Sequence, residues 1–253
     1  MTAMSERQHE RQHEKRLASA FTDLTGPLVR DVNVTDVLHT LSQHCVDLLD
    51  VSAAGVLLDV PHGPGVDVVA SDEYTRALEL FGIEWDEGPS LDCRRSPAHV
   101  SETRLDADDA CPRWPRFTPR ALLLGFTSVA TVPLRCQDTV VGALSLLHDR
   151  PRPLDDVQLR LAKALADTAA MCVIQQQVLQ GQKTQIARLQ DSLESQIVIE
   201  QAKGFLSNSR GCTADQALIR MRTYARNRQL KLSDVARQVL DGAVAHTLLA
   251  PER

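Results

Sequence analysis

The stretch Ile199-Glu200-Gln201-Ala202-Lys203-Gly204-Phe205-Leu206 lies near the C-terminus of the 253-residue chain and begins a series of short helical patterns. The first pattern is predicted to have an apolar stripe, formed by Ile197, Phe205 and Leu206. The pattern stops before residues 207–211, a run of turn formers that ends in glycine. The sequence therefore predicts a helix that ends before residue 207.

Two further helices are predicted after this turn. Thr213 and Gln216 form a capping box, which marks the start of the second helix. Its buried face is expected to contain Ala217, Leu218, Met221 and Ala225. Ser233 is expected to cap the third helix, with an inner face of Ala236, Val239, Leu240, Val244 and Leu248. Residues 190–247 thus read as a small all-α bundle of three helices.

Basic residues are concentrated in this C-terminal segment. Residues 183–253 contain eleven Lys and Arg against seven Asp and Glu, whereas the rest of the chain contains seventeen against twenty-six. Arg222 and Arg226 are four residues apart and are therefore neighbours on one helix surface. A polyanion would be attracted to this end of the molecule. An ordinary solvated helix face is the alternative interpretation.

Several separated motifs of this segment, in the same order, resemble the ANTAR domain, a small three-helix RNA-binding module of bacterial regulators and antiterminators. They are Glu200-Gln201-Ala202-Lys203-Gly204, Gly211-Cys212-Thr213, Met221-Arg222 and Lys231-Leu232-Ser233-Asp234-Val235-Ala236. Two positions interpreted as packing depart from the family: Met221 replaces a leucine, and Phe205-Leu206-Ser207 replaces the more usual Leu-Met. The resemblance implies binding of paired RNA hairpins with hexanucleotide loops in a nascent transcript, which prevents a terminator from forming.

The basic residues of the segment are candidates for these RNA contacts, because an arginine side chain can bridge phosphates and stack on unstacked loop bases. The predicted RNA-binding residues are Lys203, Gly204, Arg222, Arg226, Arg228 and Lys231. Gly204 would allow close approach of the backbone to RNA, or, alternatively, close packing of the first helix against the second. Tyr224 would stack on a base or cover the edge of the bundle. A basic three-helix unit also suits duplex DNA, so a DNA-binding regulator is an alternative function.

The remainder of the chain is long enough for one sizeable domain, and 43% of all residues are hydrophobic. Residues 1–16 are polar and are expected to form an N-terminal arm, either a frayed helix or disordered. They lack the apolar core of a secretory signal, and no run approaches the roughly eighteen apolar residues of a membrane span. The six cysteines show no CxxC spacing. These features predict a cytoplasmic protein with no membrane partner.

Residues 17–178 alternate between helical and strand patterns. Two amphipathic helices precede two predicted strand pairs, 51–60 with 66–70 and 127–134 with 139–147. Strands in pairs with flanking helices predict an α+β fold with an antiparallel sheet that is covered on one face. The stretch Gly82–Arg120 is predicted to be a long irregular loop, ordered by its tryptophans.

Five motifs in this region resemble the GAF domain, a small-molecule-sensing or dimerising fold. They are Glu87-Gly88-Pro89-Ser90-Leu91, Arg113-Trp114-Pro115-Arg116-Phe117, Gly125-Phe126-Thr127-Ser128-Val129, Val132-Pro133-Leu134 and Val141-Gly142-Ala143-Leu144-Ser145-Leu146. The resemblance implies that the long loop covers a ligand pocket on the sheet, with candidate lining residues Trp85, Leu91, Trp114 and Phe117. A pocket-free domain that serves only to dimerise is the alternative.

No cofactor is predicted, although an unidentified small-molecule ligand of the GAF-like domain is possible. Cyclic-nucleotide-binding members of the family carry an Asn-Lys-Phe-Asp-Glu signature. In this chain only Asp155-Asp156 could correspond to part of it, so we do not predict cyclic nucleotide binding. Haem is unsupported, because His99 and His148 are interpreted as ordinary surface or loop residues.

An enzymatic function is not predicted. Some GAF-fold proteins reduce methionine sulfoxide with cysteines near the pocket, and Cys93 and Cys111 lie in the long loop. Arg94-Arg95 would supply the electropositive site that a reactive Cys93 requires. A resolving cysteine at a defined spacing is not evident, and phosphate-binding loops, zinc patterns and serine elbows are missing. A thiol redox enzyme therefore remains only as an alternative, with a redox sensor favoured over a catalyst.

A heptad seam connects the two regions and predicts a coiled coil up to about residue 200. Its positions are Leu165, Thr168, Cys172, Gln175, Leu179, Gln182, Ile186, Leu189, Leu193 and Gln196. Gly181 weakens the helix and marks a possible hinge. The sequence as a whole predicts a homodimeric signal-transduction protein, an RNA-binding antitermination regulator in which a GAF sensor controls an ANTAR output. It would act on the transcription machinery indirectly.

Overall fold

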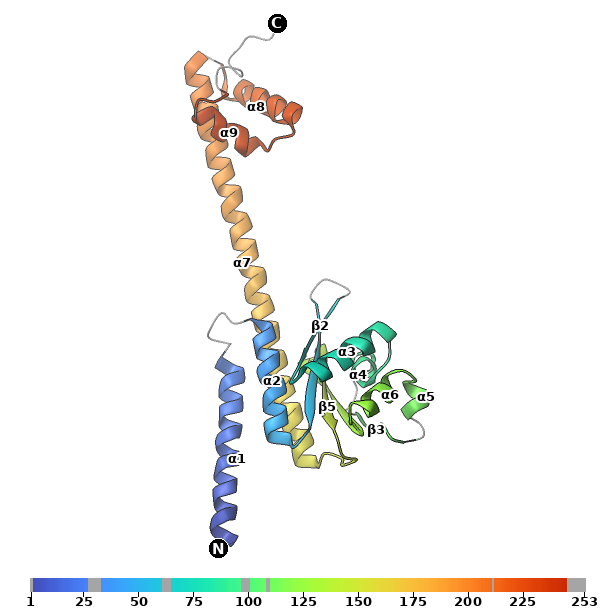
Figure 1. The fold of residues 1–253 in the computed structure, drawn as a ribbon. Helices are drawn as coiled ribbons and strands as arrows, with labels where there is room; N and C mark the ends of the chain where they lie inside the picture. Colours follow the sequence, from blue (N-terminus) through green and yellow to red (C-terminus); the bar gives the residue numbers. More distant parts are fainter. Residues whose placement is uncertain are drawn as a thin grey trace. The chain divides into compact units, whose positions relative to one another are not determined.

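The structure is a computed structural model that describes residues 2–26, 33–60, 65–96, 101–107, 110–210 and 212–244. The chain divides into two compact units, Met1–Leu179 and Gln180–Arg253. The first unit combines a sheet with helices and the second is helical, which confirms the predicted α+β fold with an all-α C-terminal module (Figure 1). Within the described ranges, every helix is too short or too polar to cross a lipid bilayer.

Five antiparallel strands form the sheet of the first unit, in the order β2-β1-β5-β4-β3. Their bounds are Ala53–Asp59 (β1), Val66–Ala70 (β2), Ser101–Arg104 (β3), Ser128–Cys136 (β4) and Thr139–His148 (β5). Both predicted strand pairs are confirmed, since β1 pairs with β2 and β4 with β5. The edge strand β3, which pairs with β4, was not predicted because four residues are too few to show an alternating pattern.

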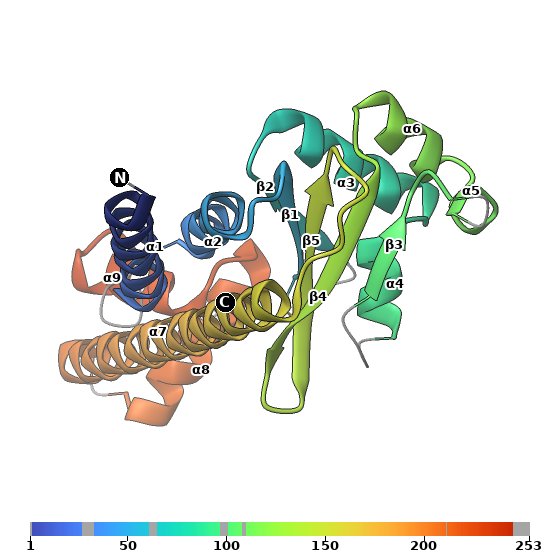
Figure 2. The same ribbon diagram turned by 90° about the horizontal axis from the view of Figure 1, so that it is seen from below.

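Helices cover both faces of this sheet, so the prediction of a single covered face is wrong. One face carries α1 (Thr2–Thr25), α2 (Val34–Leu49) and the first part of α7 (Asp156–Arg210). The opposite face carries α3 (Glu73–Trp85), α4 (Pro89–Arg95), α5 (Ala110–Arg113) and α6 (Phe117–Leu123) (Figure 2). The reason lies in β1, where every residue from 53 to 58 is buried. A strand that is apolar on both sides requires two cores.

Each face of the sheet has its own hydrophobic core. The larger core joins β1 and β5 to α1, α2 and α7, with Leu24, Leu41, Val56, Leu144 and Leu165 among its buried residues. The smaller core lies under α3 and α6 and includes Leu78, Trp114, Phe117, Val129 and Leu147. Residues 2–16, predicted as a separate arm, belong to α1.

The stretch Gly82–Arg120 is not irregular: its described part is built from α4, α5, α6, β3 and the end of α3. Polar side chains tie these short elements together. The Glu87 carboxylate accepts hydrogen bonds from the backbone N–H groups of Arg116 and Phe117, at 2.8 and 3.2 Å. The Trp114 indole N–H donates to Asp92, at 3.1 Å. Elements of four to seven residues are too short to show the periodic spacing of apolar residues that marks a helix or a strand, so the sequence does not predict them.

Helix α7 begins at Asp156, in the acidic pair Asp155-Asp156 that favours a helix N-terminus. The Asp155 carboxylate accepts hydrogen bonds from the N–H groups of Val157 and Gln158, both at 2.8 Å, and so caps the helix. The first part of the predicted heptad seam is not available to a partner helix, because Leu165 and Cys172 are fully buried in the larger core. This part of α7 satisfies its apolar face within its own chain.

A buried carboxyl lies between α3 and the sheet. Glu79 is 3% exposed and accepts hydrogen bonds from the hydroxyls of Ser90, at 3.0 Å, and Ser145. The site is tight, since a Cβ added at Gly55 would stand 2.8 Å from the Ser145 hydroxyl. Burial raises the pKa of Glu79 above its ordinary value of 4.5, while the two serine bonds partly oppose this shift.

Replacing Glu79 with glutamine should change how stability depends on pH. The raised pKa means that folded Glu79 keeps its proton above pH 4.5, where the unfolded chain has released it. The free energy of unfolding therefore falls as pH rises from 4.5 through the raised pKa. Glu79→Gln retains an acceptor for both serines and removes this titration, so its stability should fall less over the same window. Urea denaturation from about pH 4 to about pH 8 measures the difference.

The matched control is Glu73→Gln on the same helix, because the Glu73 side chain is 89% exposed. Its stability curve should run parallel to that of the wild type. A Glu79→Gln curve that also ran parallel to the wild type would show that the buried carboxyl does not govern this pH dependence.

Candidate functional site

The C-terminal unit is a three-helix bundle. Helices α8 (Ala214–Arg228) and α9 (Leu232–Leu240) pack against the end of α7. Their shared core consists of Ala202, Leu206, Ala217, Met221, Ala225, Val235, Ala236, Val239 and Val244. The predicted inner face of α8 is confirmed, with Leu218 partly buried beside it.

The capping box at the start of α8 is also confirmed. The N–H of Gln216 donates to the Thr213 hydroxyl at 3.2 Å, and the N–H of Thr213 donates to the Gln216 side chain at 3.0 Å. These two bonds satisfy backbone donors that the first turn of a helix leaves free. They fix the point at which the chain turns from α7 into α8.

The first helix of the bundle differs from its prediction, because α7 continues to Arg210. The expected turn formers are accommodated within the helix. The hydroxyls of Ser207 and Ser209 donate to the carbonyl oxygens of Lys203 and Phe205, four residues earlier, at 2.8 and 2.7 Å. The buried face also differs, since Ala202 and Leu206 are in the core while Ile197 and Phe205 are exposed.

The third helix begins two residues earlier than predicted. Lys231 is the N-cap of α9, so Ser233 lies inside the first turn instead of capping it. Val235, Ala236 and Val239 form the buried face, whereas Leu240 is exposed. The predicted core residue Leu248 lies outside the described residues.

The surface of α8 that faces away from the core carries exposed arginines. Arg222 and Arg226 lie on the same side of the helix. Within the described part of the chain, neither forms an ion pair. Ile219 is three residues before Arg222 and is 60% exposed, which is unusual for a large apolar side chain next to two cations. We call Ile219, Arg222 and Arg226 the basic face.

Arg228 and Lys231, at the end of α8 and the start of α9, are outside this face, because Arg228 lies about 200° around the helix from Arg226. The Arg228 guanidinium stands over the Tyr224 ring, 4.8 Å from its centre, and Tyr224 itself packs against the bundle core. Gln229 has a φ of 55° and ends α8, with its N–H directed to the carbonyl oxygens of Ala225 and Arg226. Exposed Lys231 follows two residues later.

Lys203 and Gly204 stand apart from this face, on α7. The Lys203 ammonium lies 2.8 Å from both carboxylate oxygens of Glu200, and its side chain is only 14% exposed. Its charge is therefore paired and largely covered. Gly204 is exposed, and a Cβ added there would meet nothing within 4 Å. The alternative that Gly204 permits helix packing is therefore wrong, and close approach of RNA remains a prediction.

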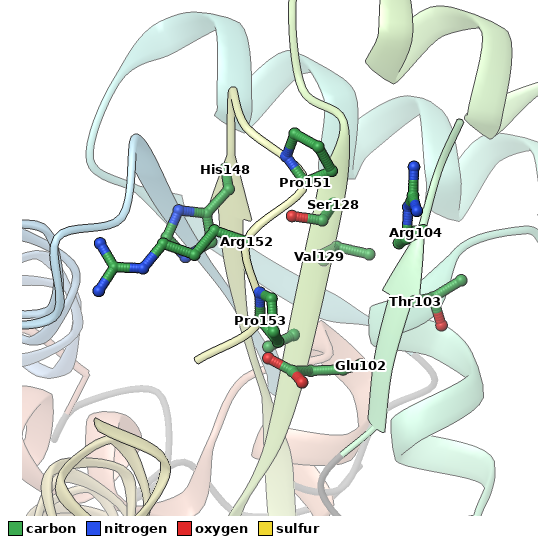
Figure 3. A pocket seen from close by; sticks show the side chains of 10 residues that line it. Glu102, Thr103, Arg104, Ser128, Val129, His148, Pro151, Arg152 and Pro153 are labelled. Atoms are coloured by element: carbon green, nitrogen blue, oxygen red, sulfur yellow. The ribbon is translucent and has the colours of Figure 1, made fainter. Parts of the chain in front are cut away.

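The four residues predicted to line a sensory pocket contribute mainly to packing. Trp114 and Phe117 are buried in the smaller core, edge to face, with ring centres 6.2 Å apart. Leu91 is buried on α4, and half-buried Trp85 stacks on Phe81 at 5.2 Å. The pocket drawn in Figure 3 is lined by none of these four.

Two predicted roles of histidine and cysteine residues need correction. His148 is not a surface or loop residue, because it is the buried last residue of β5; His99 lies outside the described residues. Cys93 is buried, and burial raises the pKa of its thiol. Arg94 and Arg95 form ion pairs with Asp59 and Asp86. Cys93 therefore lacks the low pKa and the free positive charges that the thiol-enzyme alternative requires.

Several solved structures are similar to the N-terminal part of the chain. A GAF domain/HD domain protein from Geobacter sulfurreducens is 19% identical, with a TM-score of 0.45, covering 61% of this chain and 98% of that one. The GAF domain of a putative sensor histidine kinase from Pseudomonas syringae is 14% identical, with a TM-score of 0.47, and the match covers 72% of this chain and 99% of that one. The phycoerythrobilin-bound GAF domain of a cyanobacterial phytochrome is 14% identical, with a TM-score of 0.47, and the match covers 65% of this chain and 97% of that one.

Comparison with protein families assigns both parts of the chain. No curated protein sequence matches the chain. The family model described as GAF domain matches residues 31–173, more than half of the chain, and the model described as ANTAR domain matches residues 187–240. The protein therefore belongs to the GAF domain family and carries an ANTAR domain at its C-terminal end.

Proposed function

We propose that the protein is an RNA-binding transcription antitermination regulator, with the GAF domain as sensor and the ANTAR domain as output. The ANTAR match over residues 187–240 carries this proposal. It covers a three-helix bundle with two exposed arginines that form no ion pair within the described part of the chain. No catalytic step is proposed for either domain.

The basic face suits an RNA loop better than it suits a simple polyanion. Arg222 and Arg226 can bridge successive phosphates or stack on bases, and exposed Ile219 offers an apolar contact to a base between them. The Tyr224 ring restricts Arg228, so this side chain loses less conformational entropy on binding. Lys203 must break its pair with Glu200 to contact RNA, which makes it a weaker contributor.

Binding to a hairpin stabilises that hairpin by mass action. When the hairpin shares bases with a terminator, its stabilisation disfavours the terminator, and the polymerase continues. The regulator thus acts on the transcription machinery through RNA, in the cytoplasm. Duplex DNA is the alternative target, and it is distinguished by its regular groove, which offers no unstacked bases.

Dimerisation through the middle of α7 completes the proposal. Ile186, Leu189 and Leu193 follow the three-and-four spacing of a coiled coil and are 55%, 59% and 61% exposed. All residues from 180 to 194 are exposed, so nothing in the described part of the chain covers these side chains. A second copy of α7 would bury them and bring two ANTAR domains to a pair of hairpins.

Removing the two α8 arginines should abolish specific binding. We expect the double variant Arg222→Ala, Arg226→Ala to bind a two-hairpin, hexaloop RNA at least roughly a hundredfold more weakly, since each of the two charged hydrogen bonds contributes about 1.5–3 kcal/mol. The slope of log affinity against log salt concentration should become about 1.4 shallower, because the variant neutralises two fewer phosphates. Fluorescence anisotropy at several salt concentrations measures both quantities.

The charge-matched control is Arg188→Ala with Arg237→Ala, which removes two positive charges of the same segment outside the basic face. Arg237 is also paired with Asp234, at 3.6 Å. The control should keep most of the affinity. Equal losses in both double variants would mean that net charge, and not the basic face, governs binding. Tighter binding of wild-type protein to duplex DNA would favour the alternative.

Alanine substitutions at the two solvent-facing glycines of α7 distinguish an effect on helix stability from an effect on RNA binding. Neither Gly181 nor Gly204 has a neighbour within 4 Å of an added Cβ, so alanine at either position should stabilise the helix by about 1 kcal/mol. Only Gly204→Ala should weaken RNA binding, since only Gly204 is proposed to approach the ligand. Thermal unfolding and anisotropy test this pair, and unchanged RNA affinity in Gly204→Ala would remove Gly204 from the binding site.

Charges in the exposed seam should dissociate the dimer. The wild type is expected to sediment at twice its chain mass of 27.9 kDa. The double variant Leu189→Lys, Leu193→Lys is expected to sediment at the mass of a single chain, because lysines that are buried in a coiled coil lose their hydration. Thr184→Lys with Ala187→Lys adds the same charge on the opposite side of the helix and should remain dimeric. A wild type that sediments at the single-chain mass would contradict the proposed dimer.

A further inference from the structure

Helix α7 carries a second apolar stripe within the first unit, beside the face that is buried in the larger core. Its members recur at alternating spacings of three and four residues, and none of them is fully buried: Leu161, Ala164, Thr168, Met171, Gln175 and Val178. We call these six residues the α7 stripe. Met171 is 45% exposed and Val178 49%, so the described part of the chain leaves both side chains largely uncovered. Val157, four residues before the stripe, is 64% exposed.

The α7 stripe explains why the heptad seam that the sequence predicts runs into the core. A straight α-helix drifts by about 20° for every seven residues relative to a strict heptad repeat. Counted back from exposed Ile186 in steps of seven, the repeat reaches Cys172 and Leu165, which are buried in the larger core. Counted back in steps of four, it reaches Gln182 and then Val178, where the α7 stripe ends. Two successive spacings of four residues therefore keep the seam on the exposed side of the helix.

The spacing of the α7 stripe indicates what covers it. Apolar residues that alternate between spacings of three and four pack against a second helix with the same alternation. The stripe leads, by residue spacing along α7, into Ile186, Leu189 and Leu193, which the proposed function assigns to contact with a second copy. The stripe contains no charged residue, which disfavours a nucleic acid as its partner. The partner that fits is therefore α7 of a second copy.

The two polar residues of the α7 stripe are compatible with this partner. The Thr168 hydroxyl donates to the Ala164 carbonyl oxygen on its own helix, at 2.7 Å, so burial of Thr168 leaves no unpaired hydroxyl. The amide of Gln175 contains both a donor and an acceptor. In a symmetric dimer Gln175 faces its own copy, and the two amides can therefore bond to each other.

We propose that the α7 stripe packs against the same stripe of a second copy, in parallel and in register, so that the GAF domain itself contributes to the dimer. The inference rests on the dimer of the proposed function and extends its contact from the middle of α7 into the first unit. Parallel pairing follows from that function, because two ANTAR domains must lie at the same end of the dimer to bind a pair of hairpins. The contact between the copies then begins within the sensor domain.

Disulfide cross-linking of the full-length protein tests this inference. Cysteines at the same seam position of two parallel helices come within the roughly 4.4–6.8 Å between Cα atoms that a disulfide spans. Under mild oxidation, Met171→Cys should form a covalent dimer at least about tenfold faster than Lys163→Cys, because its partner is held beside it. Lys163 is the matched control, since it is exposed on the same helix but lies about 100° around it from Ala164. Gel electrophoresis without reductant measures both rates, and the wild type gives the background from the six native cysteines.

Leu189→Cys, in the middle of α7, distinguishes this inference from the proposed dimer. The inference predicts fast cross-linking at both Met171→Cys and Leu189→Cys. Fast cross-linking at Leu189→Cys, with Met171→Cys no faster than Lys163→Cys, would overturn the inference and leave the proposed dimer intact. Slow cross-linking at both seam positions would overturn the inference and the proposed dimer together. Met171 and Lys163 are both exposed, so neither substitution removes a buried contact of the fold.

Discussion

Helix α7 is the element on which both domains depend, because it supplies buried side chains to two separate cores. Leu165 and Val173 complete the core between the sheet and α2, and Ala202 and Leu206 complete the core of the ANTAR bundle. The residues between, from 180 to 194, are exposed. Under the proposed function, a change in the GAF domain that shifts the start of α7 would reach the ANTAR domain through this helix. A flexible linker would not transmit such a change.

Two buried titratable side chains of the GAF domain, Glu79 and His148, differ in whether their polar atoms are hydrogen-bonded. Glu79 lies on the α3 side of the sheet and accepts hydrogen bonds from Ser90 and Ser145, so its polar atoms are used within the fold. His148 lies on the α7 side, and its Nε2 has no partner in the described residues. A satisfied buried group stabilises one packing arrangement, whereas an unsatisfied buried group costs free energy that other contacts in the fold must offset.

The sequence contained the features that depend on local chemistry. The Thr213 capping box, the Asp155 start of α7 and the two strand pairs follow from residue type and spacing, and the structure confirms them. It did not contain the features that depend on distant partners. The ion pairs of Arg94 and Arg95 and the burial of His148 arise from three-dimensional packing. The pair of Lys203 with Glu200, by contrast, is local, because the two residues are three apart on one helix. Ser207 was misread because a serine favours turns but also tolerates a helix when its hydroxyl bonds to an earlier carbonyl.

Control of transcription through RNA can be measured by transcription in vitro. The template would encode two hexaloop hairpins that overlap a terminator, and the measured quantity is the fraction of full-length transcript as purified protein is added. We expect this fraction to rise with protein concentration and to return to its basal value when the hairpin loops are changed. A fraction that stays constant while the protein is bound to the hairpins would contradict antitermination.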